Sequence, residues 1–576
     1  MRATAIHVAM HIDIVPNRKS APAVLLRESY RDGKKVKKRT LANLSSLSTD
    51  QVEAMRLILK GQRLAPVAEL FECVGSRHHG HVQAVRSAMQ RLGFLDLVAS
   101  QPSRERDLAC AMIASQILEP DSKLAFTRWW ENTTIPAVFG VEDATEDELY
   151  SAMDWLLERQ PHIEKKLAAR HLSEGGFALY DLSSSYFEGA KCPLAALGHN
   201  RDGKKGKLQV NYGLLTDSRG CPVALSVFKG NTGDPKTLMP QVEKARTEFG
   251  IERLVLVGDR GMISQKQIKQ CKARKGLDWI TALKTGAIRK LVDSGKLQMG
   301  LFDERNLFEL THPDFPGERL VACRNPELAK LRAHKRQSLL LATQGELEKV
   351  SRMIAKGRLE GKGAIGLRVG RVINKYKVAK HFKLEIGEKS FTWCTQDEKV
   401  DAEAALDGIY VIRTSLKKAE LDTNDAVRSY KLLSGVERAF RSMKSMDLDV
   451  RPIRHRLETR VRAHIFQCML AYYVKWHMNE VWRPLLFCDE NLEAKKSRDP
   501  VAPAVRSDEA LQKAHSRQLD DARSVHSFQT LMKRLSAIVR NVCLPAGAKS
   551  GLTFEITTTP DKTQQQALSL LEKIKV

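Results

Sequence analysis

With 576 residues, the chain is too long to fold around one hydrophobic core, so we expect three or more domains, or one domain with large insertions. Lys and Arg total 94 against 68 Asp and Glu, and the resulting net charge of +26 predicts a surface that attracts polyanions such as nucleic acid. The alternative that charge alone leaves open is a protein that is merely basic.

Cysteine spacing and hydropathy exclude further classes. The ten cysteines are scattered without a CxxC pair, which argues against a zinc module and against a disulfide framework. No apolar run approaches the length of about 18 residues that a membrane span needs, and the N-terminus lacks the pattern of a signal peptide. We therefore expect a soluble intracellular protein with no membrane partner.

The N-terminal residues 1–65 are predicted to form a β-hairpin and a helix. Residues 10–44 alternate as strands do, with Asp32-Gly33 as a turn between the runs 23–30 and 36–44. Ser48 and Gln51 form a capping box for a helix that ends near residue 61. The second arm of the hairpin is basic, and its cations either contact phosphates or prevent pairing at a sheet edge: Lys34, Lys35, Lys37, Lys38 and Arg39.

Residues 66–175 have a helical pattern and are predicted to form a helical DNA-binding domain. The expected helices lie near residues 81–92, 103–118, 121–131 and 145–170. A short break between two helices is compatible with a helix-turn-helix motif, although any small helical bundle contains such breaks. The histidines at 78, 79 and 81 could bind a metal, but an exposed polar loop is favoured.

From residue 176 to 285 the pattern predicts the first part of an α/β catalytic core. Strands are expected at 177–182, 208–215, 222–228, 254–258 and 278–284, with helices at 236–250 and 264–275. This β-β-β-α-β-α-β order fits a mixed sheet with flanking helices, and it is the order of the ribonuclease H (RNase H) fold.

The rest of the chain is predicted to contain a large α+β insertion and the end of the core. Residues 286–407 are too many for a plain loop and are expected to be a folded insertion, followed by core helices in 408–489 and a linker with a C-terminal helical segment in 490–576. Within these regions the pattern predicts a basic helical stretch at 327–362, strands at 381–396, helices at 423–446 and 456–480, a linker at 490–515, a helix at 523–541, a strand at 552–559 and a terminal helix.

Two aspartates follow predicted strands of this core. Asp181 comes directly after the apolar run 177–180, and Asp259 closes the run 254–258 before Arg260-Gly261, where the glycine permits a sharp exit from the sheet. Open α/β sheets bind ligands beyond the carboxyl ends of their strands, so the two carboxylates could share one site. An Asp in such a position is more often a turn residue or a helix cap. The hypothesis of a shared ligand site therefore needs a third carboxylate.

The third candidate is Glu437. At about 100° per residue, Tyr430, Leu433, Glu437, Arg441 and Lys444 fall on one face of a helix. An acid beside Tyr, Arg and Lys can present a metal ligand together with groups that bind phosphate. The alternative is an amphipathic helix with a solvated face.

At these residues the sequence resembles the DDE transposases of bacterial insertion sequences, in the group marked by the signature Tyr-x2-Arg-x3-Glu-x6-Lys. Tyr430, Glu437 and Lys444 match that spacing, and further similar motifs are YDLSSSYFEG from residue 180, GNTGD at 230–234, VGDRGM at 257–262 and HRLETRVRAHIFQCMLAYYV at 455–474. The resemblance covers most of residues 10–480 and is closest to the branch with a long insertion before the catalytic Glu.

The resemblance implies cleavage at the ends of a DNA element and strand transfer into target DNA. Asp181, Asp259 and Glu437 would hold two Mg²⁺ or Mn²⁺ ions, with Asp181 bridging them. The partners would be double-stranded DNA, both the element's terminal inverted repeats and its target, in a homodimeric complex. The resemblance also implies a cytoplasmic, nucleoid-associated protein of a bacterium. Further residues expected to contact DNA are Tyr430, Arg441, Lys444, Lys205, Lys207 and Arg260.

Two residues depart from the family pattern. Leu433 stands where the signature has Arg, and Lys431, Arg438 or Arg441 could replace that cation, with Arg441 on the correct face. Gly435 inside the helix costs about 1 kcal/mol relative to Ala and indicates a kink or a close backbone approach.

Other residues have weaker signals. Trp393 could wedge into a base stack but is more typical of a core strand. Asn231 and Asp234 are expected to shape a turn, while His199, Arg201 and Lys204 extend the basic loop of Lys205 and Lys207. The rival functions are a structure-selective nuclease or resolvase on the same core, and a DNA-binding transposase relative without catalysis.

Overall fold

The computed structural model describes residues 9–18, 21–62, 70–298, 300, 302, 306–491, 493, 498–546 and 552–576. The chain divides into two compact units. The first unit consists of Met1–Ser76 and Arg540–Thr558, and the second of Arg77–Val539 and Thr559–Val576. Among the residues described, no helix is both long and apolar enough to cross a membrane.

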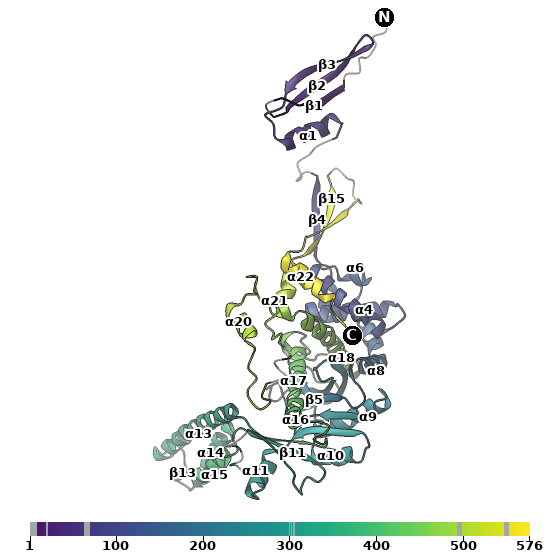
Figure 1. The fold of residues 1–576 in the computed structure, drawn as a ribbon. Coiled ribbons are helices and arrows are strands. Elements are labelled where there is room, and N and C mark those ends of the chain that lie inside the picture. The colour runs from purple at the N-terminus through teal and green to yellow at the C-terminus, as the bar shows by residue number, and fades with distance from the viewer. Residues whose placement is uncertain are drawn as a thin grey trace. The chain divides into compact units, whose positions relative to one another are not determined.

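The first unit begins with the predicted hairpin, extended to a three-stranded antiparallel sheet (Figure 1). Its elements are β1 (Ala9–Val15), β2 (Ala23–Asp32), β3 (Lys35–Asn43) and the helix α1 (Thr49–Leu59). The turn is Gly33-Lys34, one residue later than predicted, and Gly33 has a φ of 60° that suits glycine. The capping box of Ser48 and Gln51 at α1 is confirmed.

The basic strand β3 lies at the edge of this sheet and is exposed along its whole length. Three of its cations pair with acids of the same sheet: Lys37 with Asp32, Lys38 with Asp13, and Arg39 with Glu28. The edge position fits the interpretation that these charges prevent pairing with another strand.

A second sheet of this unit corrects two predictions. Strand β4 (Phe71–His78) pairs with β15 (Val539–Pro545), which pairs with β16 (Phe554–Thr557). The start of the region 66–175 is therefore a strand, and the predicted helix at 523–541 is shorter, with β15 following it. The partner of β4 lies more than 450 residues along the chain, so no local pattern reveals this pairing.

The second unit contains the predicted helical region. Its helices are α2 (Gly80–Arg91), α3 (Phe94–Val98), α4 (Arg104–Leu118), α5 (Lys123–Trp130), α6 (Ile135–Phe139), α7 (Glu146–Glu158) and α8 (Gln160–His171). The predicted helix at 145–170 breaks at Arg159, because Pro161 supplies no N–H to continue the first helix. Helix α4 is buried from Leu108 to Ile117, which makes it the central helix of this region.

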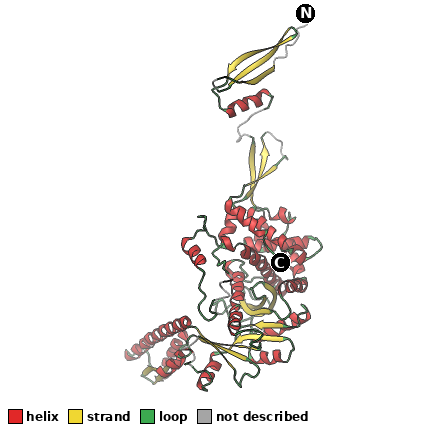
Figure 2. Ribbon diagram, viewed as in Figure 1, coloured by secondary structure: helices red, strands yellow, loops and turns green. Residues whose placement is uncertain are grey.

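The sheet of the second unit confirms the predicted mixed α/β core with flanking helices (Figure 2). The predicted order is present as β5 (Phe177–Tyr186), β6 (Gln209–Thr216), β7 (Pro222–Lys229), α9 (Pro235–Thr247), β8 (Leu254–Val257), α10 (Gln265–Lys272) and β9 (Leu277–Ala282). Strands β5, β8 and β9 are parallel, whereas β5-β6 and β6-β7 are antiparallel.

Three strands that were not predicted enlarge this sheet. They are β10 (Leu307–Leu310), β11 (Arg319–Arg324) and β14 (Ile409–Thr414), and the full order is β10-β11-β14-β9-β8-β5-β6-β7. The interval 286–407, predicted as one insertion, therefore begins with α11 (Thr285–Asp293) and two strands of the core, and the core resumes with a strand rather than with helices alone.

The part of the insertion with its own core lies between Asn325 and Gly408. It contains α13 (Pro326–Ala355), α14 (Lys362–Tyr376), η2 (Ala379–His381), β12 (Phe382–Ile386), β13 (Phe391–Thr395) and α15 (Asp397–Ala404). Its apolar side chains form a separate cluster centred on Leu347, Ile365 and Val369. We call this segment the insertion subdomain.

The chain then returns to the core as helices. They are α16 (Thr423–Lys431), α17 (Leu433–Arg441), the π-helical turn η3 (Ser442–Met446), α18 (Glu458–Val481), η4 (Arg483–Leu485), α20 (Asp508–Ser516), α21 (Phe528–Ser536) and α22 (Lys562–Leu571). Helix α18 packs on α4, α7 and β7, and so joins the helical region to the sheet. The predicted linker at 490–515 contains the start of α20 and a buried Val501.

Candidate active site

Asp181 and Asp259 occupy equivalent positions on two neighbouring parallel strands. The parallel pairing of β5 with β8 ends at Leu179 and Val257, and each aspartate lies two residues further on. The prediction that Asp181 lies at the end of its strand is wrong, because β5 continues to Tyr186 in its pairing with β6. The end of β8 instead leaves one side of β5 open at Asp181, which brings both carboxylates to the same edge.

Asp181 is a strongly perturbed carboxyl group. One of its oxygens accepts the N–H of Leu182 at 2.8 Å, and within the described part of the chain the other accepts no hydrogen bond. Burial raises the pKa of Asp181 to about 7; the carboxylates of Asp259 and Glu437 add to this, while Arg201 opposes it. A proton or a cation is therefore strongly favoured at this position.

Asp259 also keeps one oxygen available. Its Oδ1 accepts the N–H groups of Gly261 at 3.0 Å and Met262 at 2.6 Å, which holds the sharp turn after β8. Asp259 thus does stabilise a turn, which was the alternative considered from the sequence, but only its Oδ1 takes part. No described group donates a hydrogen bond to Oδ2.

Glu437 comes from α17, which packs against β5. The predicted continuous helix at 423–446 is broken at Leu432 between α16 and α17, and it loosens into η3 after Arg441. The Glu437 side chain has no hydrogen bond or ion pair among the residues that the structure describes. Its carboxylate is therefore free to bind a ligand.

Gly435 explains how α17 reaches this position. An added Cβ at Gly435 would lie 3.4 Å from the Cα of Gly220, in the turn between β6 and β7. An added Cβ at Gly220 would lie 3.2 Å from the Cα of Gly435. The close backbone approach expected from the sequence is present, and it sets the helix directly on the turn.

The three carboxylates line one pocket of about 400 Å³. Four cations line it with them, namely Arg201, Arg441, Lys444 and Arg451, together with the acids Asp202 and Asp234. Arg201 pairs with Asp234 at 2.6 Å, whereas Lys444 donates to Asp202 at 3.0 Å and Arg451 also pairs with Asp202. The pocket thus joins acidic metal ligands to groups that can bind phosphate.

Sequence reasoning missed Asp202 and Arg451. Asp202 is buried, and its Oδ2 also accepts the N–H of Tyr186 at 2.9 Å, so it fixes the loop 200–208 beside β5. Lys444, predicted to contact DNA, is buried against Asp202, and burial lowers its pKa. The only signal in the sequence was an acid within a basic loop, which does not reveal a partner 242 residues away.

The position of Leu433 clarifies what replaces the signature arginine. Leu433 packs on the hydrophobic core, and the Lys431 ammonium lies near the carbonyl oxygens of Val501 and Ala502. Arg441 lines the pocket, whereas Arg438 does not. Tyr430 lies near the carboxylates, because the charges of Asp259 and Arg260 act on its hydroxyl. Burial raises the pKa of Tyr430 to about 12.

Other residues with sequence signals do not line this pocket. Lys205, Lys207 and Arg260 are exposed, outside the lining of this pocket. Trp393 packs at 5.9 Å from Phe382 in the core of the insertion subdomain, as the core interpretation expected.

Two of the histidines at 78, 79 and 81 correct another prediction, whereas His78 is exposed. His79 and His81 are buried rather than part of an exposed loop. His79 bonds to Thr134 at 2.9 Å, and burial lowers the pKa of His81 to about 3. Both serve packing between the start of α2 and neighbouring segments.

Comparison with known proteins identifies the class. The transposase DDE domain matches residues 184–474, which is half of the chain, and the chain therefore belongs to the DDE transposases. The N-terminal domain of IS1634 family transposases matches residues 12–67. The matched DDE range includes Asp259 and Glu437 and begins three residues after Asp181. Transposases of this class cleave DNA and transfer strands, and they use divalent metal ions.

The chain was also compared with curated proteins and with solved structures. No curated protein matches the chain. Among solved structures, a cryo-EM structure of a piggyBac transposase synaptic complex with hairpin DNA matches with 9% identity and a TM-score of 0.32, over 79% of this chain and 77% of that chain.

Proposed function

We propose that Asp181, Asp259 and Glu437 hold two Mg²⁺ or Mn²⁺ ions, with Asp181 shared between them. The observation that carries this proposal is that three carboxylates from β5, the end of β8 and α17 line one pocket, and each has at least one oxygen that accepts no hydrogen bond from a described residue. Hard cations such as Mg²⁺ prefer oxygen ligands of this kind. When bound, such a metal pair activates the attacking oxygen and stabilises the leaving oxygen of a phosphodiester.

The chain's own cations have a separate role in this proposal. Arg441 is exposed at the pocket and replaces the signature arginine as the phosphate contact. Lys444 and Arg451 share Asp202, which orients them towards the pocket without leaving a buried charge unpaired. Arg201 in turn is held by Asp234.

The DNA partners in this proposal are the element's terminal inverted repeats and the target duplex. A homodimer would bring two ends together, because both must be joined to one target. The spacing of Tyr430, Glu437 and Lys444 supports membership of the Tyr-Arg-Glu-Lys group, in the branch with a long insertion, with Leu433 as the departure. Inverted repeats in the DNA that flanks the coding region would identify the ends.

The metal assignment is tested with Asp181→Asn, Asp259→Asn and Glu437→Gln. Cleavage of a duplex that carries the element's end, in Mg²⁺, should fall roughly a hundred-fold or more, since a metal site supplies several kcal/mol of transition-state stabilisation. Binding of the same duplex should stay within about twofold of the unmodified chain. The matched control is Asp293→Asn, an exposed acid at the end of α11, which should change neither.

A pre-cleaved end incubated with plasmid measures strand transfer separately. Joined products should form with the unmodified chain and be lost with the three variants. Cleavage retained by Asp181→Asn in Mg²⁺ would remove Asp181 from the metal site, and loss of DNA binding would mean that the substitution disturbs the fold.

A further inference from the structure

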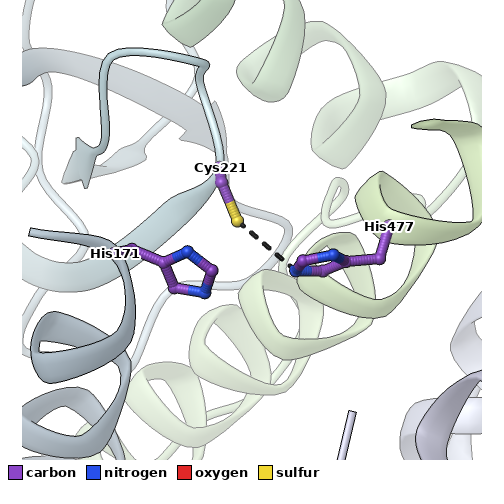
Figure 3. Close-up of side chains that lie close together, drawn as sticks. All are labelled: His171, Cys221 and His477. Carbon is purple, nitrogen blue, oxygen red and sulfur yellow. Dashed lines mark hydrogen bonds between the residues drawn. The ribbon is translucent and has the colours of Figure 1, made fainter. Parts of the chain in front are cut away.

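Outside the catalytic pocket, three side chains with metal-binding atoms converge in the interior (Figure 3). His171 is the last residue of α8, Cys221 directly precedes β7, and His477 lies on α18. One ligand atom from each lies within 4.8 Å of the others. Within the described residues this is the one cluster of three His, Cys, Asp or Glu with such spacing, and we call it the His-Cys-His cluster.

Distances within the cluster are close to those of a tetrahedral zinc site. The Cys221 Sγ lies 3.8 Å from the His477 Nε2. Zn–N bonds of about 2.0 Å and Zn–S bonds of about 2.3 Å place tetrahedral ligands roughly 3.3 to 3.8 Å apart. The other separations reach 4.8 Å at most, so small side-chain rotations suffice to close the site.

Burial favours the neutral form of all three groups, since it also raises the pKa of the Cys221 thiol well above its usual range, and metal binding must therefore release the thiol proton. Burial lowers the pKa of His171 to about 4 and that of His477 to about 3, so both imidazoles are neutral at pH 7. Nδ1 of His171 accepts from the Arg219 guanidinium at 3.2 Å, and Nε2 therefore carries the proton that it donates to the Tyr473 hydroxyl at 3.0 Å. Nδ1 thus has a lone pair available once Arg219, with a side chain 58% exposed, turns to solvent.

Beside the cluster, the carboxylate of Asp217 pairs with the exposed Arg219 at 2.9 Å, and it would offset part of a cation's charge once that arginine turns to solvent. Asp217 is buried, and its Oδ2 lies 3.9 Å from the His171 Nδ1. Its Oδ1 accepts the N–H of Cys221 at 2.9 Å, which ties the carboxylate to the cysteine. In the described part of the chain, the one hydrogen-bond partner of His477 is the Cys221 sulfur, which is a weak partner.

We propose that the His-Cys-His cluster binds one Zn²⁺ with a structural role. Binding converts the Cys221 thiol to a thiolate and releases its proton to solvent, while the two neutral imidazoles donate their lone pairs. The ion would connect the end of the helical region, the β6–β7 turn and α18. Because Gly220 of that turn contacts Gly435 of α17, the same ion would hold the helix that presents Glu437.

The primary test uses the full chain, purified without a histidine tag. Elemental analysis should find about one zinc per chain, and Zn K-edge X-ray absorption should show one sulfur at about 2.3 Å with nitrogen or oxygen at about 2.0 Å. Replacement of zinc by Co²⁺ should give a thiolate-to-cobalt charge-transfer band. The carboxylates of the catalytic pocket cannot produce that band, so the two metal sites are distinguished.

Variants assign the ligands. Cys221→Ser and His477→Gln should each lose the bound zinc and the cobalt band, and should lower the Tm of the zinc-loaded protein. The control Cys271→Ser removes another buried thiol, on α10, and should keep the bound zinc and the cobalt band.

Two results would overturn the proposal. One is an unmodified chain that neither retains zinc nor shows sulfur around an added metal. The other is a cobalt band that survives in folded Cys221→Ser. If Cys221→Ser fails to fold, two measurements on the unmodified chain still test the proposal. X-ray absorption should count one sulfur at the zinc, and removal of zinc by a chelator should lower the Tm.

Discussion

Arg441 is the residue on which phosphate recognition in the pocket is expected to depend. It lines the pocket on the same helix as Glu437, whereas Leu433 is packed in the core. Arg441→Ala should weaken cleavage about tenfold or more, because a hydrogen bond to a charged group contributes about 1.5 to 3 kcal/mol. Single-turnover cleavage of an element end measures this loss.

The matched control is Lys431→Ala, since that ammonium lies against Val501 and Ala502 rather than in the pocket. It should leave cleavage within about twofold. Equal losses in both variants would show that Arg441 has no special role.

Lys123 provides a stability prediction. It is buried beneath the Phe126 ring and has no ion pair or hydrogen bond among the described residues. Burial lowers its pKa to about 8. Relative to an ordinary lysine near 10.4, this corresponds to at most about 3 kcal/mol of destabilisation at neutral pH.

Lys123→Met should therefore raise the free energy of unfolding, measured by chemical denaturation. Between about pH 8 and 10.4 the unfolded state binds more protons at this lysine than the folded state, so the free energy of unfolding of the unmodified chain rises with pH through this group. The advantage of Lys123→Met should shrink over that window. A difference that is constant with pH would contradict the proposed cause.

At the scale of elements, the contact between the β6–β7 turn and α17 is the feature that positions Glu437. Gly220 has a φ of 83° and lies directly against Gly435. Gly220→Ala should cost about 1 to 2 kcal/mol for the left-handed backbone and should also displace α17. Cleavage should fall in addition to the loss of stability.

Gly250→Ala is the control for this effect. Gly250 has a similar φ of 72°, but an added Cβ there meets no atom of the described residues within 4 Å. It should show the conformational cost in Tm and leave cleavage by the folded protein unchanged. Equal activity of the two folded variants would mean that the turn does not position α17.

At the scale of the whole molecule, the insertion subdomain joins the sheet where its two ends meet, and Arg289 of α11 also donates to the carbonyl oxygen of Ala402 at 3.3 Å. Its ends meet where the Asn325 N–H donates to the Gly408 carbonyl oxygen at 2.9 Å, and its apolar cluster is separate from that of the sheet. Replacing residues 328–404 by a short Gly/Ser loop should leave a folded core, because bridging neighbouring ends costs little loop entropy. Cooperative thermal unfolding and retained Mn²⁺ binding would show this.

A deletion of two strands from the sheet is the control for deletion of the insertion subdomain. Removing residues 306–324 eliminates β10 and β11 and exposes the edge of β14, and this variant should aggregate or lose cooperative unfolding. Loss of folding in both deletions would contradict the independence of the insertion subdomain.

The sequence by itself determined the succession of elements from β5 to β9 and the candidate acids of the site. Apolar runs, and the glycines or acids that end them, are local features, so Asp181 and Asp259 were recognisable beside their strands. Glu437 was recognisable from helical spacing, although the breaks on either side of α17 depend on packing. The metal-binding roles of these three residues remain predictions that the variants above test.

Only the tertiary structure decided which distant segments meet. The pairing of β4 with β15, the addition of β10, β11 and β14 to the sheet, and the burial of Asp202 against Lys444 all join residues far apart in the chain. The absence of a CxxC pair excluded a local zinc motif but said nothing about His171, Cys221 and His477, which come from three separate elements. Local patterns report burial and backbone preference, whereas partners separated by hundreds of residues are chosen by the packing of the whole fold.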